Sequence, residues 1–151
     1  MTKTEPQRTI TPSSTCLRER NLVASILSDP GGNIGPNIAT ALAYCPKHWE
    51  SPESRAIGYA IKLCLKEGRK PTDVSVSEWL RKEDRDWLFN PCYRHGLPLE
   101  IAEVEAKELV IRYHGKAVCE LLGDAWQSCR NKPHDSKALV TKLLVELERL
   151  G

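Results

Sequence analysis

Residues 97–150 read LPLEIAEVEAKELVIRYHGKAVCELLGDAWQSCRNKPHDSKALVTKLLVELERL. Apolar side chains recur in the first part of this segment every three or four residues, which is the period of one face of an α-helix. The sequence Asn131-Lys132-Pro133 ends this pattern, and Asp135 or Ser136 can cap a second helix with a wide leucine face. A long helix, a proline-containing turn and a second helix predict an antiparallel helical hairpin over residues 97–151.

The long helix carries one apolar stripe, which Glu108 and Gly115 interrupt. A glycine at such a position indicates either a close helix approach or a bend. The stripe consists of Ile101, Val104, Ile111, Val118, Leu122, Ala125 and Cys129. The face of the second helix consists of Leu139, Leu143, Leu147 and Leu150, flanked by Val140 and Leu144.

The hairpin has more apolar surface than its own two helices can bury. Exposed apolar surface costs about 25 cal/mol per Å², so a partner that covers the stripe is expected. The alternative is that the stripe packs against the preceding helices. Trp126 is the best single anchor because buried aromatic residues dominate interface energy, although a core position explains a tryptophan equally well. The residues expected to contact a second subunit or a partner are Val118, Leu122, Trp126, Leu143, Leu147 and Leu150.

Residues 15–96 predict a subdomain of shorter helices. The expected helices run from a Thr15 cap to Ser28, from Pro36 to Tyr44 and from Ser51 to the stop at Gly68, followed by a short helix that carries Trp79 and Leu80. For that short helix, Ser75 and Glu78 have the spacing of a capping box. Residues 84–96 are expected to form an irregular connection. The inward positions expected in these helices are Leu17, Val23, Ala24, Leu27, Ile38, Ala41, Leu42, Ile57, Ile61, Cys64 and Leu65.

The predicted fold class is therefore all-α, with a small orthogonal helical bundle followed by a long antiparallel helical hairpin. The chain has 151 residues, of which 40% are hydrophobic and 28% are charged, which is typical of a globular domain. Residues 1–14 are polar and rich in Thr, Ser and Pro, so a disordered tail is expected there, with neither a signal peptide nor a membrane span elsewhere. We expect a cytoplasmic protein.

The net charge of +2 lacks the basic excess that an isolated nucleic-acid-binding domain usually shows. Direct DNA binding by this segment is therefore not expected. The six cysteines should be reduced thiols in the cytoplasm, with Cys64 and Cys119 on apolar helix faces acting as small buried hydrophobes.

The sequence provides no strong catalytic, cofactor-binding or metal-binding motif. The glycine-rich segment 31–36 lacks the Lys-Ser/Thr pair of a phosphate-binding loop and follows a predicted helix rather than a strand, so no ATPase activity is expected of this segment. Two Cys-x-x-His pairs, Cys45/His48 and Cys92/His95, leave a zinc-dependent enzyme or sensor as an alternative. The two pairs are far apart in the sequence and lie beside prolines, which favours the interpretation that they are unrelated loop residues and not zinc ligands.

The order of these features resembles the N-terminal domain of DnaB-type replicative DNA helicases. The segment 19–30, ERNLVASILSDP, is similar to the opening helix of that family. The stretch 49–80 resembles its next segment, including a Gly-basic-Pro-x-Asp turn at 68–73, GRKPTD, and the chain from Leu97 onward resembles the hairpin that follows. Trp49 stands where the family usually has Phe, and the connection over 84–96 is divergent, which is typical of a remote relative such as a phage or plasmid protein.

This resemblance implies a non-catalytic assembly domain. In the family, hairpins pair into dimers, three dimers form a collar on the hexameric helicase, and the ring docks primase during DNA replication. It implies self-association through the hairpin, primase or a helicase loader as a partner, DNA contact only through the full helicase, and a motor in a separate C-terminal domain. The alternative in the same process is a primase-type helicase-binding domain or a helicase loader.

Overall fold

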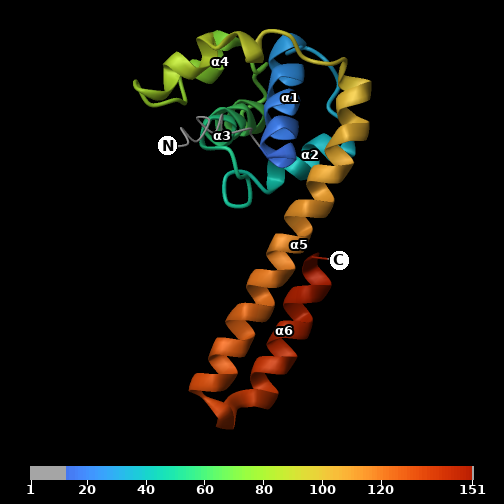
Figure 1. The fold of residues 1–151 in the computed structure, drawn as a ribbon, viewed down its shortest axis with the longest axis vertical. Helices are drawn as coiled ribbons and strands as arrows, with labels where there is room; N and C mark the ends of the chain where they lie inside the picture. The colour runs from blue at the N-terminus through green and yellow to red at the C-terminus, as the bar shows by residue number, and fades with distance from the viewer. Residues whose placement is uncertain (1–12, 151) are drawn as a thin grey trace, which may run out of the picture.

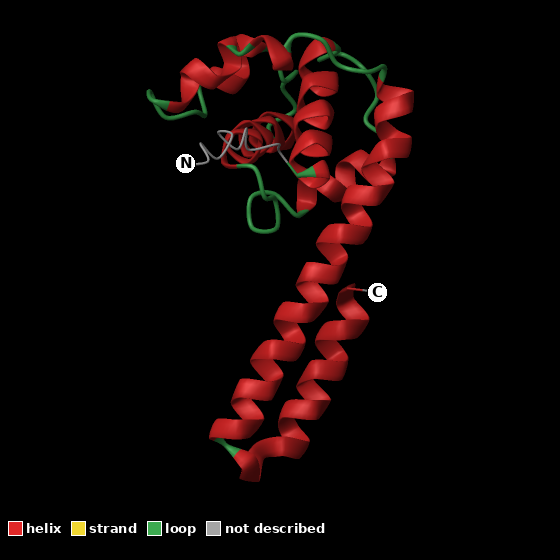
Figure 2. Ribbon diagram, in the orientation of Figure 1, coloured by secondary structure: helices red, strands yellow, loops and turns green. Residues whose placement is uncertain are grey.

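The chain folds into a helical bundle from which a long two-helix hairpin projects (Figure 1). The structure is a computed structural model and describes residues 13–150. The regular elements among these residues are all helical, as Figure 2 shows, so the predicted all-α class with a hairpin is confirmed. In chain order they are α1 (Ser14–Ser28), α2 (Pro36–Ala43), α3 (Pro52–Lys66), α4 (Asp73–Ser77), the 3-10 helices η1 (Asp84–Phe89) and η2 (Pro91–Tyr93), α5 (Leu99–Asn131), the 3-10 turn η3 (Pro133–Asp135) and α6 (Ser136–Leu150).

Helix α1 begins slightly earlier than expected. The N-cap is Ser13 and not Thr15, because the Ser13 hydroxyl accepts a hydrogen bond from the Cys16 amide at 3.1 Å. Most of the predicted disordered tail, residues 1–12, lies outside the described residues. Within α1, Val23 and Ala24 are buried as predicted, whereas Leu17 and Leu27 are only partly buried.

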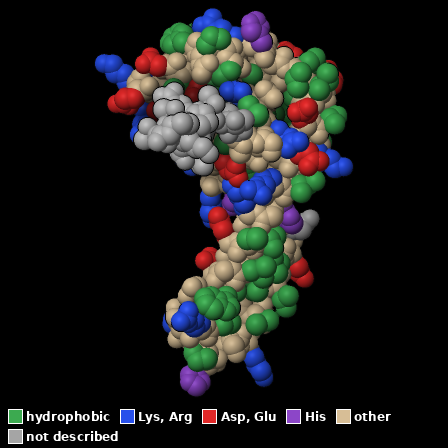
Figure 3. Space-filling model, viewed as in Figure 1, with side chains coloured by type: hydrophobic (Ala, Val, Ile, Leu, Met, Phe, Trp, Pro, Cys, Tyr) green, Lys and Arg blue, Asp and Glu red, His purple; other side chains and the backbone are tan. Residues whose placement is uncertain are grey.

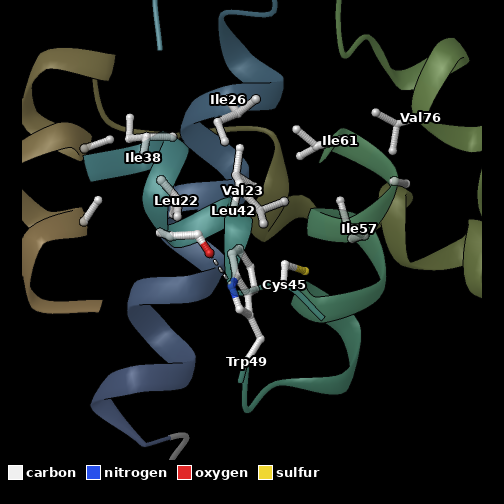
Figure 4. Close-up of a cluster of buried hydrophobic side chains, with 14 of the residues drawn as sticks. Leu22, Val23, Ile26, Ile38, Leu42, Cys45, Trp49, Ile57, Ile61 and Val76 are labelled. Carbon is white, nitrogen blue, oxygen red and sulfur yellow. Dashed lines mark hydrogen bonds between the residues drawn. The ribbon is translucent and has the colours of Figure 1, made fainter. Parts of the chain in front are cut away.

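The core of the bundle lies between α1, α2 and α3, and the first half of α5 closes it with buried side chains of its own (Figure 4). In α3, the predicted inward residues Ile57, Ile61 and Cys64 are fully buried, and Leu65 is partly buried. Burying an aliphatic side chain contributes about 1.5–3 kcal/mol, so this cluster supplies much of the stability of the bundle. Its main members are Leu22, Val23, Ile26, Ile38, Leu42, Cys45, Trp49, Ile57, Ile61 and Val76.

The segment from Gly68 to Ser77 shows one correct and one wrong local prediction. Gly68 ends α3 with φ +73°, a conformation that glycine adopts without steric cost. The predicted Ser75–Glu78 capping box is wrong, because α4 begins earlier and its box joins Thr72 and Ser75. Ser75 Oγ accepts from the Thr72 amide at 2.9 Å, and Thr72 Oγ1 accepts from the Ser75 amide at 3.2 Å. Glu78 instead forms an ion pair with Arg69 at 2.8 Å.

The connection over residues 84–96 is more regular than predicted. It contains η1 and η2, which bury Leu88 and Tyr93, and the Tyr93 hydroxyl lies 3.2 Å from Ser54 Oγ. A 3-10 helix has three residues per turn, so a search for α-helical periodicity does not detect it. After η2, a Cβ atom on Gly96 would lie 2.2 Å from the Ser25 amide nitrogen, so the chain passes close to the α1 backbone only because this residue is glycine.

Helix α5 connects the bundle to the hairpin. It has 33 residues and is therefore about 50 Å long, beginning two residues later than the predicted start at Leu97. Its first half packs on α1 and α2, and its second half packs on α6. The buried side chains of α5 lie in its first half or just beyond the middle of the helix: Leu99, Ala102, Ala106, Leu109, Tyr113 and Ala117.

Two carboxylates attach the first half of α5 to the bundle. Glu103 of α5 accepts hydrogen bonds from the amides of Asn37 and Ile38, at 2.6 and 3.0 Å, and so occupies the N-terminus of α2. Glu19 of α1 is fully buried and accepts from the Ser51 amide at 2.8 Å and from the Tyr113 hydroxyl of α5. These bonds satisfy the buried carboxylate oxygens of Glu19 and fix the direction in which α5 leaves the bundle.

Candidate interaction surface

The seam between α5 and α6 only partly excludes water. Leu121, Ala125 and Ser128 of α5 face Leu139 and Leu143 of α6 around a groove of about 250 Å³. None of the described residues 118–150 is buried within the chain. The hairpin therefore lacks a closed core of its own, in contrast to the bundle.

The side chains next to the seam divide the hairpin into two different sides. Successive residues of an α-helix are rotated by about 100°, and α5 and α6 run in opposite directions while facing each other. The residues that follow seam positions therefore turn to the same side on both helices. Leu122 and Trp126 follow the seam residues of α5, and Val140 and Leu144 follow those of α6.

These four residues define a surface that we call the apolar hairpin face: Leu122, Trp126, Val140 and Leu144. Their exposed fractions are 48%, 58%, 49% and 57%. Figure 3 shows hydrophobic side chains gathered along the hairpin on the side that it presents. Apolar surface that is exposed and contiguous typically marks an interaction site in a protein of this kind.

The opposite side of the hairpin is charged. Glu120, Asp124 and Lys142 precede seam positions and therefore lie on this other side, where Asp124 and Lys142 also line the edge of the seam groove. Val145 is exposed by 45% and precedes Glu146, which lines the seam groove, so it also turns to the charged side. The hairpin is thus two-sided in chemical character.

The stripe identified in the sequence does not pack on the bundle. Ile101, Val104 and Ile111 are exposed by 48%, 71% and 57%, so the alternative that this stripe faces the preceding helices is wrong for them. The bundle instead contacts a stripe that contains Ala102 and Ala106, because small side chains let α5 approach α1 and α2 closely. The exposed stripe extends along α5 toward the apolar hairpin face.

The structure distributes the residues that the sequence singled out for an interface. Leu122 and Trp126 are exposed, and the other members are partly buried. Leu143 faces the seam, so part of its apolar surface is used within the hairpin. The partly buried members are Val118, Leu143, Leu147 and Leu150.

Two residues of the face, Val140 and Leu144, were expected from the sequence only to flank the leucine face of α6 and not to contact a partner. Both are as exposed as the predicted Leu122. The signal that could have found them is their offset by one residue from Leu139 and Leu143, which turns them to one side of an antiparallel pair. The guanidinium of Arg130 lies 5.3 Å from the Trp126 ring centroid and forms a polar edge to this face.

Ion pairs hold the base of the hairpin. Lys116 and Arg112 of α5 approach the Glu50 carboxylate at 3.0 and 3.3 Å, and Lys47 approaches Glu120 at 3.3 Å. The hydrogen bond from Lys116 is the main cause that lowers the pKa of Glu50 below its ordinary value. These contacts connect the 47–50 loop to α5 where the helix leaves the bundle.

The Cys-x-x-His pairs do not converge on a metal site. Cys45 Sγ donates to the Arg55 carbonyl at 3.3 Å, and burial raises the pKa of this thiol to about 12, so it is a poor ligand and nucleophile. His48 is buried, Cys92 is partly buried and His95 is exposed. Within residues 13–150, no group of three or more His, Cys, Asp or Glu side chains is placed to hold a metal ion.

One further expectation about cysteine is wrong. Cys64 is buried as predicted, but Cys119 is exposed. The reason is that Cys119 lies where α5 leaves the bundle, in an open groove that it lines together with Lys47 and His48. Apolar periodicity therefore identified a face of the helix without identifying what covers it.

The fold and this surface define an all-α domain with a projecting, two-sided helical hairpin. Comparison with known proteins assigns it to no family, because no family model, no curated protein and no solved structure matches the chain. Of the helices described between residues 13 and 150, none combines the length and the apolar character that crossing a membrane requires.

Proposed function

We propose that this chain is a non-catalytic assembly module that pairs with a second copy of itself through the apolar hairpin face. The observation that carries the proposal is the exposure of Leu122, Trp126, Val140 and Leu144 on one side of a hairpin that lacks a closed core. Two hairpins that pack these faces together form a four-helix bundle, which gives each hairpin the core that it lacks alone.

The distribution of charge supports an antiparallel, two-fold arrangement of the two hairpins. Near the tip of the hairpin, Arg130, Lys132 and Lys137 outnumber the one acidic residue, Asp135, and at the base end of α6, Glu146 and Glu148 outnumber Arg149. In a two-fold pair with opposite directions, the tip of each hairpin meets the base of the other, so these charges are complementary. A parallel pair would instead place like charges together.

The biological role of such a pair is proposed from the sequence resemblance. A dimer formed through the hairpin is the unit from which the collar of a DnaB-type helicase is built, and that collar docks primase. DNA contact would then come through the helicase motor and not through this domain. The alternative role, a helicase loader or a primase-type helicase-binding domain, differs in the protein that the purified chain captures: a helicase rather than primase.

The test of self-association is sedimentation of the full chain over a range of concentrations. Leu144→Asp is expected to convert the dimer to a monomer, because a carboxylate in the centre of the apolar pair would be desolvated without a partner. The matched control is Val145→Asp, which introduces the same charge at the adjacent exposed position on the charged side. Leu143 is not suitable for this test, because it lines the seam of the hairpin itself.

A monomer for the wild-type chain at all concentrations would overturn the proposal. So would equal loss of the dimer in Leu144→Asp and Val145→Asp, because it would place the interface elsewhere. Circular dichroism of both variants checks that each keeps the helical content of the parent.

A further inference from the structure

A second surface lies on the bundle, between α3 and the segment that contains α4 and η1. It is an open groove of about 390 Å³, lined by the aromatic rings of Tyr59, Trp79 and Trp87. Tyr59 and Trp79 are each exposed by 40%, and Trp87 is partly buried. Ala56 and Leu80 complete an apolar floor. The self-association proposed above uses none of these residues.

The groove is rich in hydrogen-bond donors. Neither indole N–H of Trp79 and Trp87 is bonded to a described residue, whereas the indole N–H of Trp49 donates to the Ala41 carbonyl at 2.9 Å. The Arg55 guanidinium also lines the groove, and no ion pair joins it to a described carboxylate. An indole and a guanidinium donate hydrogen bonds and accept none.

The acceptors among the lining side chains are fewer: the Tyr59 hydroxyl, which can donate or accept, and one carboxylate. Its carboxylate, Asp84, is buried and forms an ion pair with Arg81, with Nε and Oδ2 at 2.9 Å. This pair leaves the aromatic rings and the donors of Arg55 as the main features available to a ligand. A matching ligand therefore presents acceptors, flat apolar rings and few donors.

We propose that this groove binds a proline-rich peptide segment in the polyproline II conformation. Proline has no backbone N–H, and a polyproline II helix makes no internal hydrogen bonds, so its carbonyl oxygens are free to accept from indole and guanidinium donors. Its pyrrolidine rings pack on aromatic side chains, as in other grooves that recognise such segments.

Other ligands fit the groove less well. An amphipathic helix satisfies its own backbone carbonyls and does not need the indole donors. Single-stranded nucleic acid stacks on aromatic rings, but it needs a positively charged track along the backbone, and here Asp84 neutralises one of the two arginines. The donor-rich but nearly neutral lining favours the peptide.

The test uses the full chain and a fluorescently labelled oligoproline peptide of about ten residues, with fluorescence anisotropy as the readout. We expect saturable binding, no binding of a Gly-Ser peptide of equal length, and no comparable binding of an oligothymidylate. Trp79→Ala should weaken the binding by about tenfold or more, because aromatic anchors dominate such interfaces. Phe89→Ala, at an exposed aromatic residue that lines neither this groove nor the apolar hairpin face, is the matched control and should leave it unchanged.

Tyr59→Ala provides a second variant on a different helix, in case Trp79→Ala alters the fold, and thermal melting of both variants checks their stability. Failure of the wild-type chain to bind oligoproline overturns the proposal. Equal affinity of the Trp79→Ala, Tyr59→Ala and parent chains also overturns it, as does tighter binding of the oligothymidylate at the same groove. Loss in both groove variants with retention in Phe89→Ala supports it.

Discussion

The two halves of α5 have similar apolar periodicity but different surroundings. In the first half, Tyr113 is fully buried, stacks on Trp49 with ring centroids 6.0 Å apart, and donates to Glu19. In the second half, Trp126 is exposed by 58%. Both are aromatic residues of one helix, so their difference shows that the elements packed against a helix, and not its own pattern, decide which side chains are buried.

The largest effect expected from this comparison is on the free energy of unfolding. Tyr113→Ala should destabilise the chain by about 3–5 kcal/mol, because it leaves a cavity beside Trp49 and removes a donor from the buried Glu19 carboxylate. Trp126→Ala should change the stability of the monomer by less than about 0.5 kcal/mol. Urea denaturation at low protein concentration measures both, and similar losses in the two variants would contradict the comparison.

A smaller effect is expected from two glycine substitutions. Gly96→Ala places a Cβ atom against the α1 backbone and should destabilise the chain by about 1–3 kcal/mol. In the hairpin, a Cβ atom on Gly123 meets no described atom within 4 Å, so Gly123→Ala should stabilise α5 by up to about 1 kcal/mol. In thermal unfolding, the midpoint should fall for Gly96→Ala and rise for Gly123→Ala. A lower midpoint for Gly123→Ala would indicate close packing at that position.

The smallest effect concerns the ion pairs at the base of the hairpin. In the folded chain, the pKa of Glu50 lies below its ordinary value of 4.5. The ionised carboxylate therefore stabilises the fold at a pH above the unfolded pKa, and this contribution is lost as the pH falls through the folded pKa. Lys116→Met removes the main cause and should cost less than about 1 kcal/mol at pH 7, because the pair is partly exposed. The difference from the parent should shrink at low pH to the part that comes from the hydrogen bond that Lys116 Nζ also donates to the His48 carbonyl, at 3.2 Å. Lys142→Met, on the charged side of the hairpin, is the control for removal of one lysine charge. A loss of stability in Lys116→Met that does not depend on pH would contradict the assignment of this loss to Glu50.

Local sequence signals predicted most of the helices. Ser51-Pro52 and Gly68 delimit α3 correctly, because a cap, an N-terminal proline and a glycine stop act within one helical turn. The same kind of reasoning selected the wrong capping box at Ser75, since Thr72 offered a competing hydroxyl three residues earlier. Short signals therefore locate a helix end well only where a single candidate is present.

The candidate surface was only partly predictable. Leu122 and Trp126 were named from the sequence and are exposed, whereas Val140 and Leu144 join them only because α5 and α6 pack in one particular rotation. The aromatic groove could not be predicted, because Tyr59, Trp79 and Trp87 come from separate segments of the chain. Surfaces assembled from distant residues leave no local pattern.

The sequence by itself determined that the chain is all-α, that it ends in a long helix and a leucine-faced partner helix, and where most turns fall. These features depend on periodicity and on capping, which operate over a few residues. Only the tertiary structure decided which stripe of α5 is buried, because Ala102 and Ala106 allow a close approach to the bundle that bulkier Ile101 and Val104 do not. Burial is a property of two surfaces in contact, and one helix specifies only its own.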